Sequence, residues 1–206
     1  TEVLVNDGKA VGVKFADGGV ARSKAVVLAS GVYLNGRIIT GDYVLSSGPS
    51  GYAPANSLTD SLVKLGLPMR RFKTGTPARI YRDSIDFSKM EIQLGENTDR
   101  FSFMTKVSTF EEEPCYLTYT NEETHKIILD NIHRSPLYNG SISGVGPRYC
   151  PSIEDKLRTF AGKTEHQLFL EPEGRGTNEY YLQGFSSSLP LEVQMEALHQ
   201  IEGLEN

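Results

Sequence analysis

Short apolar runs separated by glycine turns constrain this chain most, because each run is too short for a helix and each turn reverses the backbone. Val3–Val5 and Val11–Phe15 are each followed by a turn rich in Asp and Gly. Lys24–Ala29 is a continuous apolar run, which is typical of a strand buried on both faces of a parallel sheet. Residues 1–31 therefore predict a hairpin leading into a buried strand that ends at Ser30-Gly31.

The middle of the chain changes from loop to helix to sheet. Residues 41–56 are rich in Gly, Ser, Pro and Ala, which predicts a loop. Leu58, Leu62 and Leu65 fall on one helical stripe, and Gly66 stands where that helix would end. An antiparallel sheet is favoured by strand-like pieces at 79–81, 91–94, 101–103 and 116–119.

The last part of the chain alternates helices with strands. Thr120 and Glu123 have the spacing of a capping box, and Ser152 with Asp155 repeats the signature of a helix start. Strands are predicted at 167–170 and 180–182, and a last helix begins near Pro190. We therefore expect a mixed α/β (α+β) chain, with a domain boundary between residues 74 and 75.

Composition excludes several broad classes. The net charge of −5 argues against a protein that holds nucleic acid by bulk charge, although a local basic patch is compatible with it. No apolar run approaches the roughly 20 residues needed to span a bilayer. Two cysteines and four scattered histidines have no zinc-site spacing, so we expect no metal site. Free thiols predict a reducing, cytoplasmic location.

Both ends of the sequence lie inside stretches that look ordered. The first residue is Thr, no secretory signal precedes Val3, and the chain stops directly after a predicted helix. These features predict an internal piece of a longer protein.

Residues 144–156, Gly-Val-Gly-Pro-Arg-Tyr-Cys-Pro-Ser-Ile-Glu-Asp-Lys, concentrate the features that favour chemistry. Ser152 is the predicted N-cap, so Cys150 lies just ahead of the positive end of a helix dipole, and Arg148 adds a cation. Both effects favour the thiolate form of Cys150. Free amides at the helix start, together with Arg148 and Lys156, could hold a phosphate or pyrophosphate.

The same loop also has a purely structural interpretation. Most cysteines are small buried hydrophobes, and a Gly-Pro loop before a helix is often only a connection. Gly144-Val145-Gly146 does not complete a GxGxxG fingerprint, because Tyr149 stands at the third glycine position. The residues alone leave a reactive and a structural Cys150 both open.

Other titratable residues favour structural roles. Cys115 follows the acidic stretch Glu111–Glu113, which disfavours a thiolate. His125 and His133 are eight residues apart on one predicted helix, too far to share an ion, so a surface or hydrogen-bonding role is favoured. Glu154 and Asp155 are interpreted as first-turn carboxylates that stabilise the helix dipole, with a general acid–base role as the alternative.

Several segments resemble one known family. Residues 146–156 resemble the signature of the MnmG/GidA family, and the matching segments follow in the expected order over nearly the whole chain. These further segments are Lys73–Pro77, Pro114–Asn121, His133–Pro136, Phe169–Gly174 and Gly203–Asn206.

The resemblance implies a fold and an activity. The fold is an FAD domain of the glutathione-reductase type, interrupted by a second domain that binds NAD(P)H. Residues 1–74 would then be part of the flavin domain and residues 75–206 the nicotinamide-binding domain. The implied activity is installation of the 5-carboxymethylaminomethyl group on uridine-34 of tRNA, using FAD, NADH and a folate one-carbon donor, with the GTPase MnmE as partner and a homodimer as the full-length form.

The resemblance also implies site residues. Cys150 is carried over as the catalytic residue, acting either as a nucleophile at C6 of the uridine or as a proton donor. The residues expected to contact the nicotinamide or flavin cofactor are Gly146, Pro147, Arg148, Tyr149, Cys150, Pro151, Ser152, Ile153, Glu154, Asp155, Lys156, Phe160, Gly31 and Ala55.

The chain departs from the full family pattern in three ways, one of which is that it includes neither the later return to the flavin domain nor the C-terminal helical domain that the family uses for tRNA and partner contacts. It lacks the GxGxxG that should cradle the FAD pyrophosphate, and Tyr52-Ala53-Pro54 stands where the family usually has an Arg. We therefore expect the isolated piece to bind FAD poorly and to be inactive alone. Two alternatives remain: a module that binds tRNA or a partner without a redox role, and a relative of the folate- and FAD-dependent tRNA uridine methyltransferase, which the loop fits less well.

Overall fold

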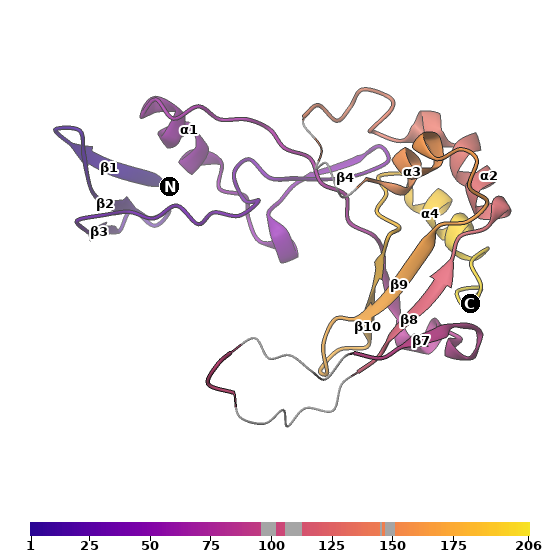
Figure 1. Cartoon of the computed structure of the whole chain (residues 1–206). Coiled ribbons are helices and arrows are strands. Elements are labelled where there is room, and N and C mark those ends of the chain that lie inside the picture. Colours follow the sequence, from indigo (N-terminus) through magenta and orange to yellow (C-terminus); the bar gives the residue numbers. More distant parts are fainter. Residues whose placement is uncertain (96–101, 106–112, 145, 147–150) are drawn as a thin grey trace. The chain divides into compact units, whose positions relative to one another are not determined.

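The computed structural model describes residues 1–95, 102–105, 113–144, 146 and 151–206. The chain forms two compact units, Thr1–Arg71 and Phe72–Asn206 (Figure 1). The sequence places the boundary between 74 and 75, and the binding roles it assigns to the two parts remain predictions.

The first unit begins with the predicted hairpin. Strands β1 (Glu2–Asn6), β2 (Lys9–Lys14) and β3 (Val20–Arg22) form an antiparallel sheet in the order β1-β2-β3. Gly12 in β2 has φ +151°, and a Cβ there would lie 2.2 Å from the carbonyl oxygen of Ala21. Because β2 and β3 approach this closely, only glycine fits at that position.

Helix α1 (Asn56–Lys64) follows the predicted leucine stripe. Leu62 is buried at 2% exposure, whereas Leu65 is exposed. The backbone N–H of Val3 donates to Ser61 Oγ at 3.3 Å, which joins α1 to β1. The helix prediction is confirmed, with Leu62 rather than the whole stripe as its buried anchor.

Two predictions for this unit are wrong. Lys24–Ala29 forms no strand, and Val27 is 89% exposed, because a strand buried on both faces needs neighbours that the described residues do not supply. Residues 41–56 are not all loop, since β4 (Arg37–Thr40) pairs with β5 (Tyr43–Ser46) in a tight hairpin. Gly41 makes its turn with φ +55°.

The second unit is built on an antiparallel sheet of order β6-β10-β9-β8-β7. Its strands confirm the predicted ones except at 101–103, where Ser102 and Phe103 are in a turn segment and Phe101 lies outside the described residues. The strands are β6 (Arg79–Tyr81), β7 (Glu91–Gln93), β8 (Cys115–Tyr119), β9 (Gln167–Pro172) and β10 (Glu179–Gln183).

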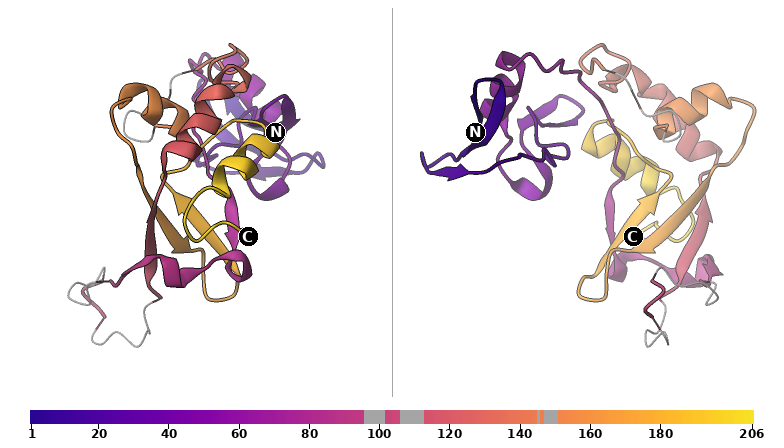
Figure 2. Two further views of the ribbon diagram at one scale, coloured as in Figure 1. Left: turned by 90° about the vertical axis from the view of Figure 1, so that its right-hand side faces the viewer. Right: turned by 60° about the vertical axis from the view of Figure 1, so that its left-hand side comes forward.

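Three helices bury one face of this sheet (Figures 1 and 2). They are α2 (Glu122–Asp130), α3 (Ile153–Thr159) and α4 (Leu191–Leu198). Leu168, Leu170 and Leu182 alternate along β9 and β10, are fully buried, and pack against the helices. Short 3-10 turns are at Pro49–Gly51, Arg82–Ser84, Phe87–Lys89 and Ile132–Arg134.

The two predicted helix caps have different outcomes. Ser152 Oγ accepts from the N–H of Asp155 at 3.1 Å, so the predicted cap of α3 is confirmed. At α2 the cap is Asn121, whose Oδ1 accepts from the N–H of Thr124 at 2.9 Å. Thr120 is instead buried at 2%, because β8 runs up to Tyr119 and turns Thr120 into the interior.

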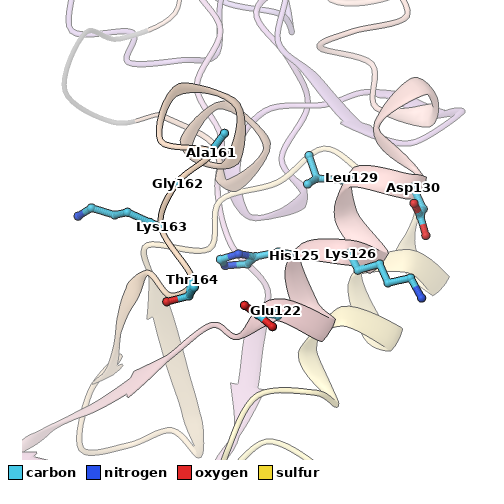
Figure 3. A pocket seen from close by; sticks show the side chains of 9 residues that line it. All are labelled: Glu122, His125, Lys126, Leu129, Asp130, Ala161, Gly162, Lys163 and Thr164. Carbon is cyan, nitrogen blue, oxygen red and sulfur yellow. The ribbon is translucent and has the colours of Figure 1, made fainter.

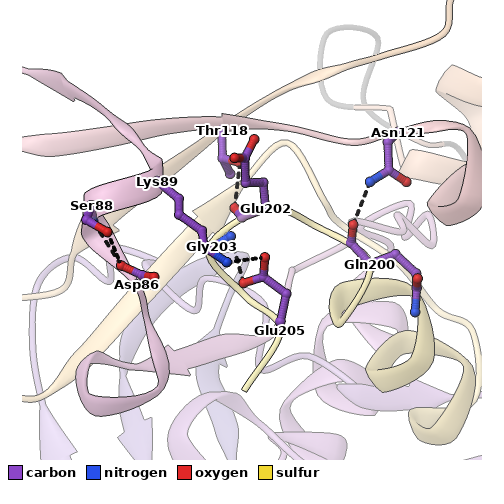
Figure 4. Close-up of polar contacts among 9 residues, drawn as sticks. All are labelled: Asp86, Ser88, Lys89, Thr118, Asn121, Gln200, Glu202, Gly203 and Glu205. Atoms are coloured by element: carbon purple, nitrogen blue, oxygen red, sulfur yellow. Dashed lines mark hydrogen bonds and ion pairs between the residues drawn. The ribbon is translucent and has the colours of Figure 1, made fainter.

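The C-terminal segment is fastened to the sheet by polar contacts (Figure 4). Thr118 Oγ1 donates to the carbonyl of Glu202 at 3.0 Å, and Lys89 Nζ lies 2.8 Å from Glu205 Oε1. Gly203 has φ +86°, and a Cβ there would lie 2.5 Å from Met90 Cε and 3.0 Å from the carbonyl oxygen of Asp86. The turn at Gly203 therefore leaves no room for a side chain.

Replacing Gly203 with Ala should lower the unfolding free energy by about 2–4 kcal/mol, because it combines a left-handed backbone with overpacking. Urea unfolding followed by far-UV circular dichroism measures the loss. Gly176→Ala is the matched control, since a Cβ there meets no atom within 4 Å. Equal midpoints for the two variants would contradict the packing argument.

Candidate functional site

The start of α3 is held by a second loop. The N–H of Ile153 donates to the carbonyl of Ser186 at 2.8 Å, and Ile153 itself is fully buried. Ser152 is 6% exposed, and its hydroxyl oxygen accepts the hydrogen bond that caps α3. Residues 151–156 and 186–189 therefore form one folded element.

Glu154 lies at the centre of this element and is completely buried. Its Oε1 accepts from Ser135 Oγ at 3.1 Å, from Ser187 Oγ at 3.1 Å and from the N–H of Ser188 at 3.3 Å. Glu154 lies in the first turn of α3, as the sequence predicts, and its carboxylate faces the protein interior.

Asp155 and Tyr138 form the next contact along the helix. Tyr138 Oη donates to Asp155 Oδ1 at 2.6 Å, and the guanidinium of Arg158 lies 4.9 Å from the centre of the Tyr138 ring. Burial, followed by the hydrogen bond to Asp155, raises the pKa of Tyr138 to about 12. Tyr138 is therefore a neutral hydrogen-bond donor near pH 7.

Lys156 and Phe160 have different surroundings. Lys156 Nζ donates to the carbonyl of Gly184 at 2.8 Å, where the chain turns with φ +102°. Phe160 is 51% exposed beyond the end of α3. Lys156 thus fastens α3 to the end of β10, and Phe160 remains accessible.

The segment Lys73–Gly75 runs beside this element. A Cβ on Gly146 would lie 2.9 Å from Lys73 Cε, and a Cβ on Gly75 would lie 2.9 Å from Ser186 Cβ. Three stretches that are distant in sequence therefore meet here: residues 73–75, 146 with 151–156, and 186–188. Sequence reasoning missed Ser186–Ser188, for which the only signal was three consecutive serines before Leu189-Pro190.

Part of the predicted site lies outside the described residues. These positions are Pro147, Arg148, Tyr149 and Cys150. The predicted catalytic residue is among them. Gly146, Pro151–Lys156 and Phe160 are described and lie together in the second unit.

Gly31 and Ala55 belong to the first unit, where Tyr33 links them. The N–H of Tyr33 donates to the carbonyl of Ser30 at 3.1 Å, and its carbonyl accepts from the N–H of Ala55 at 2.8 Å. Gly31 is exposed with φ +50°, and a Cβ there would meet no atom within 4 Å. The structure therefore brings the two predicted flavin contacts together with open backbone at Gly31.

Two of the basic residues near 70–79 have protein partners, each within its own unit. Arg71 donates to the carbonyl of Asn35 at 3.0 Å in the first unit. Arg79, in the second unit, pairs with Glu173 and lies 4.6 Å from the centre of the Tyr181 ring. Both guanidinium groups already have protein partners.

A shallow pocket of about 360 Å³ lies between α2 and residues 161–164 (Figure 3). His125 lies at its floor, 8% exposed, and none of the predicted cofactor residues lines it. His125 Nε2 is 2.7 Å from Thr120 Oγ1, which also accepts from the N–H of His166 at 2.8 Å. Helix α2 ends at Asp130, so His125 and His133 do not share a helix, and the hydrogen-bonding role of His125 is confirmed.

The two buried histidines resist protonation. Their ring centres are 5.4 Å apart. Burial lowers the pKa of both, the charge of His125 lowers the pKa of His166 further, and Glu122 opposes the shift at His125. Cys115 is a free thiol whose pKa is raised by burial and by Glu171.

None of the helices in the described ranges is both long and apolar enough to cross a bilayer. No group of three or more His, Cys, Asp or Glu side chains within those ranges is arranged to hold a metal ion.

Comparison with known proteins identifies the family. The family described as "Glucose inhibited division protein A" (GIDA) matches residues 1–206. This chain belongs to the GidA family. The resemblance read from residues 146–156 and the other matching segments is therefore confirmed.

Two curated relatives of high identity share one enzyme name. The "tRNA uridine 5-carboxymethylaminomethyl modification enzyme MnmG" of Caldicellulosiruptor saccharolyticus is 58% identical over 206 residues, and that of Clostridium botulinum strain Okra is 56% identical. Each alignment covers 100% of this chain and 33% of the relative. This GidA-family chain thus spans about a third of the length of the curated relatives it matches.

A solved structure of the family has the same fold. Aquifex aeolicus GidA, in its form I crystal, is 45% identical with a TM-score of 0.89, covering 100% of this chain and 35% of that one. The predicted mixed α/β fold class, as a piece of the GidA fold, is confirmed.

Stability of this GidA-family chain should decrease as the pH falls below 6.5, the value for a histidine in the unfolded chain. The folded chain binds fewer protons at His125 and His166 than the unfolded chain does, so unfolding is favoured by acid in that window. Urea unfolding at several pH values measures the slope. The double variant His125→Gln/His166→Gln should flatten it, whereas exposed His199→Gln should not; an unchanged slope in the double variant would refute the assignment.

Proposed function

We propose that this chain is part of an enzyme that installs the 5-carboxymethylaminomethyl group on wobble uridine-34 of tRNA. The observation that carries the proposal is the 58% identity over the whole chain to a relative named for that modification. Full-length activity with the GTPase partner MnmE, a homodimeric form and a cytoplasmic location belong to the same proposal.

The cofactor assignment rests on local geometry. Gly31 offers open backbone next to Ala55, which fits a flavin approaching the first unit. In the second unit, Gly146, Pro151–Lys156 and Phe160 belong to the stretch proposed to bind the reduced nicotinamide, which would supply hydride to the flavin. Within this stretch, exposed Phe160 is suited to direct contact, whereas Glu154 and Lys156 bind the protein itself.

Cys150 is the proposed catalytic residue, as a nucleophile at C6 of the uridine or as a proton donor, while the folate provides the one-carbon unit. The second cysteine is the less suitable thiol, because burial and Glu171 raise the pKa of Cys115. The two cysteines therefore provide an internal comparison.

Cys150→Ser in the full-length enzyme should reduce tRNA modification by at least about a thousandfold, as loss of a reacting group does. Cys115→Ser should retain activity within about threefold, because a thiol kept protonated contributes no thiolate. Modified uridine is measured by mass spectrometry of digested tRNA. Full activity of the Cys150 variant would remove that residue from the mechanism.

The alternative of a binding module without a redox role is tested by titration. NADH and tRNA are added separately to the full-length enzyme and to its Arg148→Ala variant. Saturable NADH binding that weakens about tenfold in the variant supports the redox assignment, since loss of one charge-assisted contact has that size. Salt-sensitive tRNA binding with no NADH binding supports the module instead.

A further inference from the structure

Glu154 occupies an unusual environment for a first-turn glutamate. Such residues normally face water and interact with the helix dipole. Glu192, in the corresponding first turn of α4, follows that rule, with 66% of its side chain exposed and a pairing to Arg134. Glu154 has no exposed surface at all, so it cannot touch a ligand that arrives from solvent.

The buried carboxylate joins three stretches of chain. Ser135 follows the turn after α2, Ser187 and Ser188 precede α4, and Glu154 itself belongs to α3. Ser135 Oγ and Ser188 Oγ also lie 3.0 Å apart, so the Ser135 hydroxyl contacts Ser188 as well as the carboxylate. Three hydrogen bonds therefore converge on one carboxylate oxygen and connect the three stretches.

Only one oxygen of the carboxylate is used. Glu154 Oε2 is buried and has no hydrogen-bond partner among the described residues. An amide cannot reproduce this arrangement. If its oxygen faces the three donors, its NH₂ is buried where Oε2 had no partner; if it turns over, the NH₂ faces the donors.

We propose that Glu154 is a positioning residue of the enzyme. Its carboxylate holds residues 151–156 against Ser135 and Ser187–Ser188 in the geometry on which ligand binding by that stretch depends. This role rests on the proposed function, because the proposed function identifies the ligand as the reduced nicotinamide. It explains why a carboxylate inside the proposed binding stretch faces inward.

The test compares Glu154→Gln with Glu192→Gln in the full-length enzyme, since both variants replace a first-turn glutamate with the amide of the same size. Glu154→Gln should raise the KM for NADH about tenfold while kcat changes less than about twofold, because binding geometry and not the reacting atoms is disturbed. Glu192→Gln should leave both unchanged. An unchanged KM in Glu154→Gln, or a fall in kcat alone, would overturn the proposal.

A milder substitution, Ser187→Ala, and a second measurement, hydrogen exchange, extend the test. Ser187→Ala removes one donor, and its effect on KM should be smaller than that of Glu154→Gln and not additive with it. Hydrogen exchange of peptides covering 151–157 and 185–189 should be faster in Glu154→Gln than in Glu192→Gln. If the wild-type enzyme shows no NADH-dependent modification, the cofactor assignment fails on the wild type alone. Exchange then decides the role of Glu154, and equal exchange in the two variants overturns it.

Discussion

The burial of one face of the antiparallel sheet is the constraint on which the second unit depends. Leu168, Leu170 and Leu182 alternate along β9 and β10 with side chains that are fully buried against the helices. Ile128 of α2 and Ile153 of α3 complete the same core. Ile153 packs in this core and so fixes the start of α3. The position of residues 151–156, the proposed ligand-binding stretch, is therefore set by apolar packing.

Polar groups inside this helix layer refine that position. Glu154 with its serine donors, and Thr120 with two histidines, both join stretches that are distant in sequence. Each group is enclosed, so its hydrogen bonds are strong and its loss would leave partners unsatisfied. The polar contacts therefore specify one arrangement of segments, whereas the apolar core provides most of the stability.

Local patterns were predicted well and distant contacts were not. Ser152 caps α3 as expected, because a cap depends on residues within one turn. The prediction that Thr120 caps α2 is wrong. Asn121, one residue later, is the cap, and Thr120 follows β8 into the interior. Lys24–Ala29 has the composition of a buried strand, but composition does not provide the neighbouring strands that such a strand requires.

The sequence by itself determined the family, the strands of the second unit, and the stretch proposed to carry the chemistry, because these are encoded in local order and alternation. Only the tertiary structure decided that Glu154 is buried against Ser135 and Ser187, and that Lys73 lies beside Gly146. The physical reason is that a side chain's environment is set by the segments folded against it. Those segments here come from positions tens of residues away, which no local pattern specifies.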